Sequence, residues 1–191
     1  DIVFKATEEN LTKIKTYLND NFSDYFISPG NHDLLPDEKI FYEVFKKDFY
    51  FKEFNSYILI SANFSNPNWL PNKNQIKNIN KIINNSTKKN VVILSHQIFW
   101  QKKVDSKIKP NSYALLNESL DSQPLSWIED DEKNYIIISG DYGAFGQKTF
   151  CYKDHNYLYI ANGIGAHEND SILRLIDTKD VLYIEEIKLS K

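Results

Sequence analysis

The chain has 191 residues, of which 41% are hydrophobic and 14% aromatic, and its formal net charge is −3. That length and apolar content suit a single domain over residues 1–191 with one sizeable core. The absence of a basic block disfavours nucleic acid as a partner. The absence of any apolar run of spanning length predicts no membrane segment.

The first half of the chain predicts helices that alternate with short strands. Apolar residues at a spacing of three and four residues indicate a helix, as at Leu11, Ile14 and Leu18. A short apolar run before Pro29 and Gly30 indicates a strand that ends there. In chain order, this half predicts a helix over 6–19, a strand over 25–28, a helix over 37–45, a hairpin of 49–54 with 57–62, and a helix over 74–85.

The second half predicts mostly strands. The runs 91–94 and 135–138 consist mainly of Val, Ile and Leu, which is typical of strands buried on both faces. Two pairs are expected to form hairpins: 149–152 with 157–160, and 172–176 with 181–189. The long polar stretch 97–131 has weak periodicity, so we expect an insertion or lid loop beside a site.

This order of elements favours one fold class over another. Helices occur early, and strands with hairpin connections dominate later. The pattern predicts an α+β fold, a four-layer αββα sandwich of two mixed sheets flanked by helices, rather than a doubly wound parallel sheet.

Polar groups follow the ends of three apolar strands of this prediction. Asn31, His32 and Asp33 follow the first, His96 follows the second and Asp141 follows the third. Side chains that extend from the ends of neighbouring strands can meet at one point. An imidazole, an amide oxygen and a carboxylate are suitable ligands for a divalent metal ion. The pattern therefore predicts a metal site.

Plainer interpretations exist for each of these groups. Residues 30–33 could form a tight turn with polar capping, and His96 could be a hydrogen-bonded histidine at the end of a strand. Residues 140–143 also suit an ordinary turn. The repetition of a ligand after a strand, three times in one chain, is what favours the metal site.

At these positions the chain resembles the calcineurin-like metallophosphoesterases. That family carries an Asp-x-His, a Gly-Asp, a Gly-Asn-His followed by Asp or Glu, a lone His after a strand, and a Gly-His-x-His. The tetrapeptide of residues 30–33 is similar to the third motif, and His96 is similar to the fourth. Asp1 resembles the Asp of the second motif. The likeness extends from Asp1 to the terminal hairpin.

The resemblance implies a set of metal ligands. One divalent ion would be held by Asp1, Asn31, His96 and Asp141, and Mn, Fe, Zn and Mg are not distinguished. A second ion in the full-length protein would depend on Asp1 and on residues upstream of it, because a chain that starts at Asp1 and contains no Met looks cut from a longer protein. The last motif departs from the family, since Gly143 stands where its second His would be.

The resemblance also implies an activity. The family hydrolyses phosphoesters by direct attack of a metal-activated water on phosphorus. His32 would assist the leaving group, and Asp33 would hold the His32 ring in its working orientation. The expected partner is a small phosphorylated substrate, and neither its identity nor the oligomeric state follows from the sequence.

Other features leave alternatives open. The missing ligand at Gly143 favours a second interpretation, a catalytically reduced binding module on the same scaffold. His167 lies on a loop after a strand and is a candidate replacement ligand. Four lysines of the long polar stretch, Lys102, Lys103, Lys107 and Lys109, could attract an anionic substrate or form a solvated loop face. The single Cys151 excludes an internal disulfide and assigns no compartment.

Overall fold

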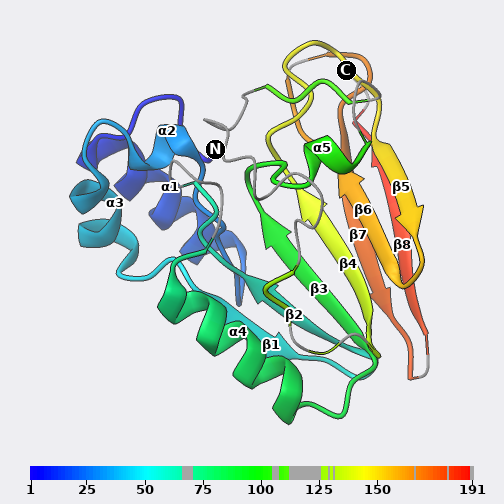
Figure 1. Ribbon diagram of the computed structural model, residues 1–191. Helices are drawn as coiled ribbons and strands as arrows, with labels where there is room; N and C mark the ends of the chain where they lie inside the picture. Colours follow the sequence, from blue (N-terminus) through cyan, green and yellow to red (C-terminus); the bar gives the residue numbers. More distant parts are fainter. Residues whose placement is uncertain are drawn as a thin grey trace.

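The computed structural model describes residues 1–65, 71–104, 108–111, 126–128, 130, 132–165, 167–179 and 181–189, which form a mixed α and β fold (Figure 1). The helices are α1 (Glu8–Asn21), α2 (Asn31–Leu34), α3 (Glu38–Phe45), α4 (Lys73–Asn85) and α5 (Gln101–Val104). The strands are β1 (Tyr50–Glu53), β2 (Tyr57–Ser61), β3 (Asn90–Ser95), β4 (Asn134–Ser139), β5 (Phe150–Asp154), β6 (Tyr157–Ala161), β7 (Ser171–Asp177) and β8 (Leu182–Lys188). None of the described helices combines the length and the apolar character that a membrane crossing requires.

The larger sheet is mixed and, among the described residues, contains six strands in the order β1-β2-β3-β4-β6-β5. Strands β2, β3, β4 and β6 run parallel, while the edge strands β1 and β5 pair antiparallel with their neighbours. At the centre, Ile93 pairs with Ile60 on one side and Ile137 on the other, and all three side chains are fully buried. Branched apolar residues suit these strands because both faces are covered.

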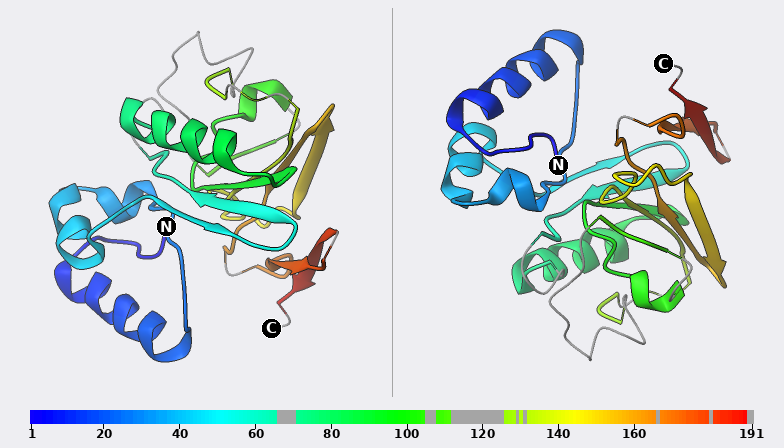
Figure 2. Two further views of the ribbon diagram at one scale, coloured as in Figure 1. Left: turned by 90° about the horizontal axis from the view of Figure 1, so that it is seen from below. Right: turned by 90° about the horizontal axis from the view of Figure 1, so that it is seen from above.

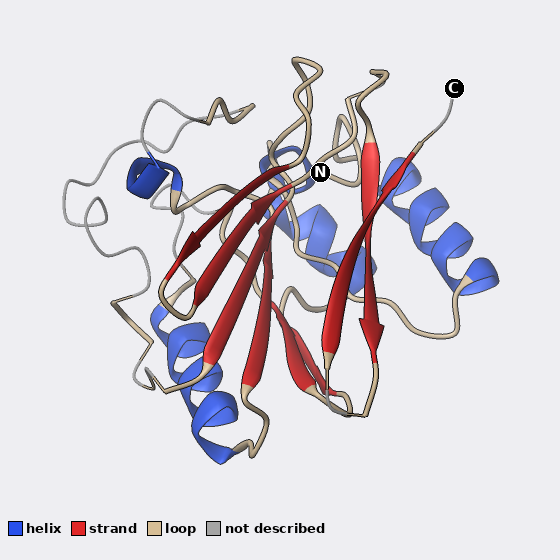
Figure 3. Cartoon of the chain, turned by 90° about the vertical axis from the view of Figure 1, so that its right-hand side faces the viewer, coloured by secondary structure: helices blue, strands red, loops and turns tan. Residues whose placement is uncertain are grey.

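Different elements cover the two faces of the larger sheet. Helix α4 lies against one face, where Ile79 and Ile83 are fully buried in the main core. The antiparallel hairpin β7–β8 forms the second, smaller sheet on the opposite face (Figures 2 and 3). The structure thus places helix, larger sheet and smaller sheet in that order.

Carboxylates tie the β7–β8 hairpin to the larger sheet at both ends. At the end of β7, the Asp177 carboxylate accepts hydrogen bonds from the backbone N–H groups of Asn55 (2.7 Å) and Ser56 (3.1 Å). Near the start of β7, Glu186 of the paired strand accepts a hydrogen bond from the Thr149 hydroxyl at 2.6 Å. Polar contacts therefore fix this hairpin relative to the strands that lead to the site.

Helices α1, α2 and α3 pack around a second apolar cluster, whose most buried members are Leu11 and Phe41. This cluster lies beside the edge of the larger sheet formed by β1 and β2 (Figure 2). Helix α1 begins two residues later than predicted, because the Thr7 side chain caps it by accepting a hydrogen bond from the N–H of Asn10.

Most of the predicted elements are confirmed to within two residues at each end. The three predicted hairpins all pair antiparallel, and the two predicted buried strands lie side by side as β3 and β4. These segments have the strongest periodicity or the longest apolar runs in the chain, so local sequence was sufficient to define them.

The predicted strand over 25–28 is wrong. Residues 25–28 are extended but belong to no sheet among the described residues. The segment contacts the region after β2 through a side chain and not through backbone strand pairing. The Ser28 hydroxyl donates to the carbonyl oxygen of Ala62 at 2.8 Å. Ile27 is buried in the cluster of α1 to α3. The apolar run therefore reflects packing against helices and not membership of a sheet.

The stretch 97–131 is more ordered at its start than a lid loop would be. Helix α5 lies within it, and Ile98, Trp100 and Val104 are buried in the main core. The Trp100 Nε1–H group donates to the Ser139 hydroxyl at the end of β4 (3.0 Å). The prediction of a lid falls mainly on residues 105–107 and 112–125, which lie outside the described residues.

Candidate metal centre

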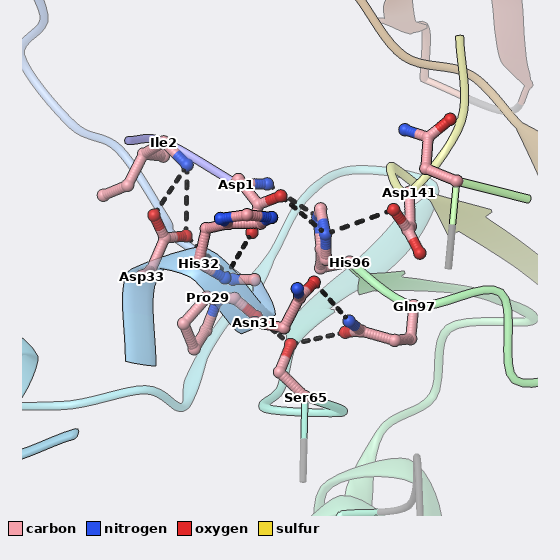
Figure 4. Close-up of polar contacts among 12 residues, drawn as sticks. Asp1, Ile2, Pro29, Asn31, His32, Asp33, Ser65, His96, Gln97 and Asp141 are labelled. Carbon is pink, nitrogen blue, oxygen red and sulfur yellow. Dashed lines mark hydrogen bonds and ion pairs between the residues drawn. The ribbon is translucent and has the colours of Figure 1, made fainter. Parts of the chain in front are cut away.

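His96 and Asp141 meet at the carboxyl-terminal ends of β3 and β4, two central strands of the larger sheet (Figure 4). Because these strands are parallel neighbours, the residues that follow them emerge side by side. The backbone N–H of Asp141 donates to the His96 carbonyl oxygen at 2.7 Å, which fixes the two turns relative to each other. Asp1, Asn31 and Asp141 line one cavity of about 420 Å³ beside these strand ends.

The Nε2 atom of His96 is the most unusual polar atom of the site. It is buried and makes no hydrogen bond to any described residue. Two carboxylate oxygens lie near it, Asp1 Oδ2 at 3.4 Å and Asp141 Oδ1 at 3.7 Å. Burial lowers the pKa of His96 to about 4, so the ring is neutral at pH 7. A buried nitrogen without a partner is costly unless something binds it.

The other ring nitrogen of His96 is engaged by the first residue of the chain. The Asp1 amino nitrogen lies 2.7 Å from His96 Nδ1. This contact occupies Nδ1, which leaves Nε2 as the ring nitrogen that faces the two carboxylates.

These donor atoms fit a divalent ion in type and in spacing. Donor atoms that share one tetrahedral ion at bond lengths of about 2.1 Å lie about 3.4 Å apart, close to the two distances from His96 Nε2. Among the described residues, no three His, Cys, Asp or Glu side chains lie close enough together to form a complete metal-binding group. The site is therefore a set of donors around one buried nitrogen, to which the Asn31 amide adds an uncharged fourth.

The glycine of the predicted tetrapeptide is required by the position of Asp1. A Cβ atom on Gly30 would lie 2.1 Å from Asp1 Oδ1, which no side chain could tolerate. The same Oδ1 atom accepts a hydrogen bond from the backbone N–H of His32 at 2.9 Å. Gly30 thus lets the Asp1 carboxylate rest on the start of α2, which directs its second oxygen toward His96.

Asn31 is held by residues that the sequence interpretation missed. Its Oδ1 atom lies 3.0 Å from Gln97 Nε2, and Gln97 Oε1 contacts the Ser65 hydroxyl. That hydroxyl also lies 2.6 Å from the carbonyl oxygen of Pro29. Gln97 is only 1% exposed. Its position directly after His96 was the one signal available for it, and Ser65 carried none.

Asp33 does not hold the His32 ring, which corrects the prediction. Its fully buried carboxylate accepts hydrogen bonds from the backbone N–H groups of Ile2, Val3 and Gly30 at 2.8 to 3.1 Å. The carboxylate therefore fastens the first residues of the chain to the start of α2. Asp33 serves the site by positioning Asp1, which lies directly before these N–H groups.

His32 is oriented by Phe4 instead. Its Nδ1 atom lies 2.9 Å from the Phe4 carbonyl oxygen, which can only accept the Nδ1–H proton. The Phe4 ring stacks on the His32 ring, with centroids 5.4 Å apart and planes 22° from parallel. His32 lines the same cavity as Asp1 and Asp141. The Nε2 atom is therefore the nitrogen that a ligand in the cavity could reach.

Neither Gly143 nor His167 lines the cavity that Asp1, Asn31 and Asp141 share. Gly143 has a φ of 99°, and a Cβ atom there would lie 3.0 Å from the backbone of Gly163, so the loop requires glycine. The His167 Nε2 atom lies 3.1 Å from the Ala144 carbonyl oxygen. His167 therefore contacts this loop through Nε2, and it does not line the cavity that Asp1 and Asp141 share.

The lysines of the long polar stretch have separate roles where the structure describes them. Lys103 pairs with Asp154 at 2.6 Å, and Lys109 lies over the Phe145 ring at 4.0 Å. Lys107 and the side chain of Lys102 lie outside the described part of the chain. Asn111, from the same stretch, borders the cavity and donates its backbone N–H to the Asp141 carbonyl oxygen at 3.0 Å.

No protein-family model matches the chain, and no curated protein sequence matches it. The function must therefore be argued from the geometry of the site itself.

Proposed function

We propose that this protein is a metal-dependent phosphoesterase of the calcineurin-like type. The buried Nε2 atom of His96, unpartnered and flanked by Asp1 and Asp141, carries the proposal. The order of layers, helix α4, then the larger sheet, then the β7–β8 hairpin, matches three of the four layers of the αββα arrangement that we propose. A neutral imidazole facing two carboxylates is an arrangement that a cation would stabilise.

Asp1, Asn31, His96 and Asp141 are the residues that would hold the ion, which could be Mn, Fe, Zn or Mg. Such an ion supplies Lewis-acid polarisation of a phosphoryl oxygen and lowers the pKa of water. The four residues named above would position the phosphate at the carboxyl-terminal ends of β3 and β4.

His32 is proposed to assist the leaving group. The Phe4 carbonyl holds its Nδ1 proton, so a protonated ring can donate its Nε2 proton to the departing oxygen. His32→Ala is expected to lower kcat by about 10² to 10⁴-fold and to lower the free energy of unfolding by no more than about 1 kcal/mol, since the exposed ring gives up one hydrogen bond. Steady-state hydrolysis of an aryl phosphate in the presence of Mn²⁺ measures this.

The matched control for that experiment is His155→Asn. His155 lies in the exposed turn between β5 and β6 with a φ of 53°, a conformation that asparagine tolerates. Its kcat should equal that of the unmodified protein. A folded protein that hydrolyses no phosphoester with any of these ions would refute the proposed activity, and a fully active His32→Ala variant would refute the role of His32 alone.

The cavity also favours a phosphoester with an apolar leaving group. Besides its polar residues, the cavity is lined by the apolar residues Ile2, Val3, Phe4, Ala144 and Ile164, which we call its apolar wall. Phe4 is 89% exposed and Ile164 is 63% exposed, so their apolar surfaces are available to a ligand. Phe4 also stacks on His32. The apolar wall therefore lies next to His32, the residue that we propose assists the leaving group.

Phe4→Ala is expected to raise KM for an aryl phosphate by about tenfold, because one aromatic contact is lost. The KM for a small polar phosphoester should stay within about twofold. The control is Phe51→Ala, which removes another exposed ring, from β1, outside this cavity. Equal effects of Phe4→Ala on both substrates would show that the apolar wall does not select the leaving group.

A second candidate function is a catalytically reduced binding module on the same scaffold. The observation that favours it is Gly143, where the backbone itself requires glycine and supplies no ligand side chain. In this case the protein would bind a divalent ion and a phosphorylated ligand without turnover. Binding of Mn²⁺ together with no hydrolysis of any phosphoester would select this alternative.

A further inference from the structure

A partly buried chain of polar contacts leads from Pro29 through Ser65 and Gln97 to Asn31, and we call it the amide relay. Its contacts are Pro29 carbonyl to Ser65 hydroxyl (2.6 Å), Ser65 hydroxyl to the Gln97 amide, and Gln97 amide to Asn31 amide (3.0 Å). Figure 4 shows Asn31 between this relay and the pair of Asp1 and His96. The relay therefore ends at the proposed metal ligands.

Counting protons limits how the amide relay can be bonded. The Pro29 carbonyl can only accept, and the Ser65 hydroxyl carries a single proton. If the Gln97 oxygen faces Ser65, the single hydroxyl proton has two acceptors, the Gln97 oxygen and the Pro29 carbonyl oxygen. One of these two short contacts then has no hydrogen between its oxygens. If Gln97 presents its NH₂ group, both contacts are hydrogen bonds: Ser65 donates to Pro29, and Gln97 donates to Ser65.

The second arrangement also fixes Asn31. With its NH₂ group on Ser65, Gln97 turns its oxygen toward Asn31, which must then donate its own NH₂ group. Each change is a half-turn of an amide about its last side-chain bond, which moves no heavy atom appreciably because oxygen and nitrogen are nearly equal in size. All three contacts of the relay are then hydrogen bonds, against two in the opposite arrangement.

We propose that Ser65 and Gln97 are positioning residues that turn the Asn31 amide oxygen toward the cavity shared with Asp1 and Asp141. Asn31 lines this cavity, and because Gln97 occupies one end of its amide, the other end is the one left for a ligand there. An oxygen there is a ligand for a cation, whereas an NH₂ group would repel one. This inference rests on the proposed metal-dependent function, because it assigns the atom by which Asn31 contributes to that site.

The direction of the relay, meaning which end of the Gln97 and Asn31 amides faces each neighbour, can be measured without a metal. In the metal-free protein, the Gln97 NH₂ protons should show strong nuclear Overhauser contacts to the β-protons of Ser65. The Asn31 NH₂ protons should lie against the Gln97 side chain. Strong contacts from the Gln97 NH₂ group to Asn31, with none to Ser65, would overturn the proposal whether or not the protein binds a metal.

A double-mutant cycle with Mn²⁺ as the probe tests the consequence. By calorimetric titration, Gln97→Leu should weaken Mn²⁺ binding by about tenfold, the usual effect of losing a residue that orients a ligand. Asn31→Ala should weaken it at least as much, and the double variant should bind no more weakly than Asn31→Ala, because Gln97 acts only through Asn31.

Two results of this cycle would refute the positioning role. If Gln97→Leu binds Mn²⁺ as tightly as the unmodified protein or more tightly, the relay does not aim the Asn31 oxygen at the ion. If the two losses multiply in the double variant, Gln97 acts independently of Asn31. Absence of Mn²⁺ binding by the unmodified protein would instead refute the proposed metal site, while the nuclear Overhauser contacts would still decide the direction of the relay.

Discussion

Replacing His96 by glutamine is expected to weaken Mn²⁺ binding by at least about a hundredfold and, at the same time, to stabilise the metal-free protein. The affinity falls because the substitution removes the nitrogen that faces both carboxylates, a larger loss than that of a residue that only orients a ligand. The stability rises by about 1 kcal/mol, because a glutamine NH₂ group can donate to Asp1 or Asp141, whereas His96 Nε2 has no partner.

Opposite changes in affinity and stability distinguish a binding site from ordinary packing. A histidine retained only for packing would lose stability on substitution and would leave metal affinity unaffected. Calorimetric titration with Mn²⁺ and urea unfolding in the presence of a chelator measure the two quantities. If His96→Gln lowers the free energy of unfolding and leaves Mn²⁺ affinity unchanged, His96 is not a metal ligand.

The control for this experiment is His167→Ala. His167 was the candidate replacement ligand, but its Nε2 atom lies against the Ala144 carbonyl oxygen. Mn²⁺ affinity should therefore remain within about twofold of the unmodified protein, while the loss of one hydrogen bond lowers the free energy of unfolding by about 1 kcal/mol. Reduced affinity in this variant would place His167 in the site after all.

Local sequence predicted the parts of the fold that are held by local periodicity or by buried apolar runs. The Val and Ile residues of β3 and β4 could occupy only the centre of a sheet, and the isoleucine stripe of α4 could only face it. The convergence of His96 and Asp141 followed from that placement, since residues after parallel neighbouring strands emerge together. These inferences needed no knowledge of how distant segments pack.

The predictions were wrong where a segment distant in the sequence makes the contact that was expected from another residue. Tyr25–Ser28 has the composition of a strand, yet it packs against helices and bonds Ala62 through a side chain. Asp33 was paired with His32 by the resemblance to the phosphoesterase family, whereas the chain before α2 brings three N–H groups to its carboxylate. Gln97 and Ser65 form contacts 32 residues apart, which single-sequence periodicity does not encode.

Asp33→Asn should be the most destabilising conservative substitution in the site. The Asp33 carboxylate accepts backbone hydrogen bonds from Ile2, Val3 and Gly30 while fully buried. An asparagine has one oxygen, and its NH₂ group would face N–H donors, so at least one donor loses its partner in a buried site. The free energy of unfolding is expected to fall by about 2 to 4 kcal/mol, as measured by urea denaturation.

The same substitution tests what Asp33 does for function. Because these N–H groups hold the segment that carries Asp1, Asp33→Asn should also weaken Mn²⁺ binding by about tenfold or more. Asp37→Asn is the matched control, since Asp37 caps α3 and asparagine caps a helix equally well. If Asp33→Asn instead left stability and Mn²⁺ affinity unchanged and lowered only kcat, Asp33 would act through the His32 ring. The hydrogen bonds from residues 2 and 3 would then be incidental to the site.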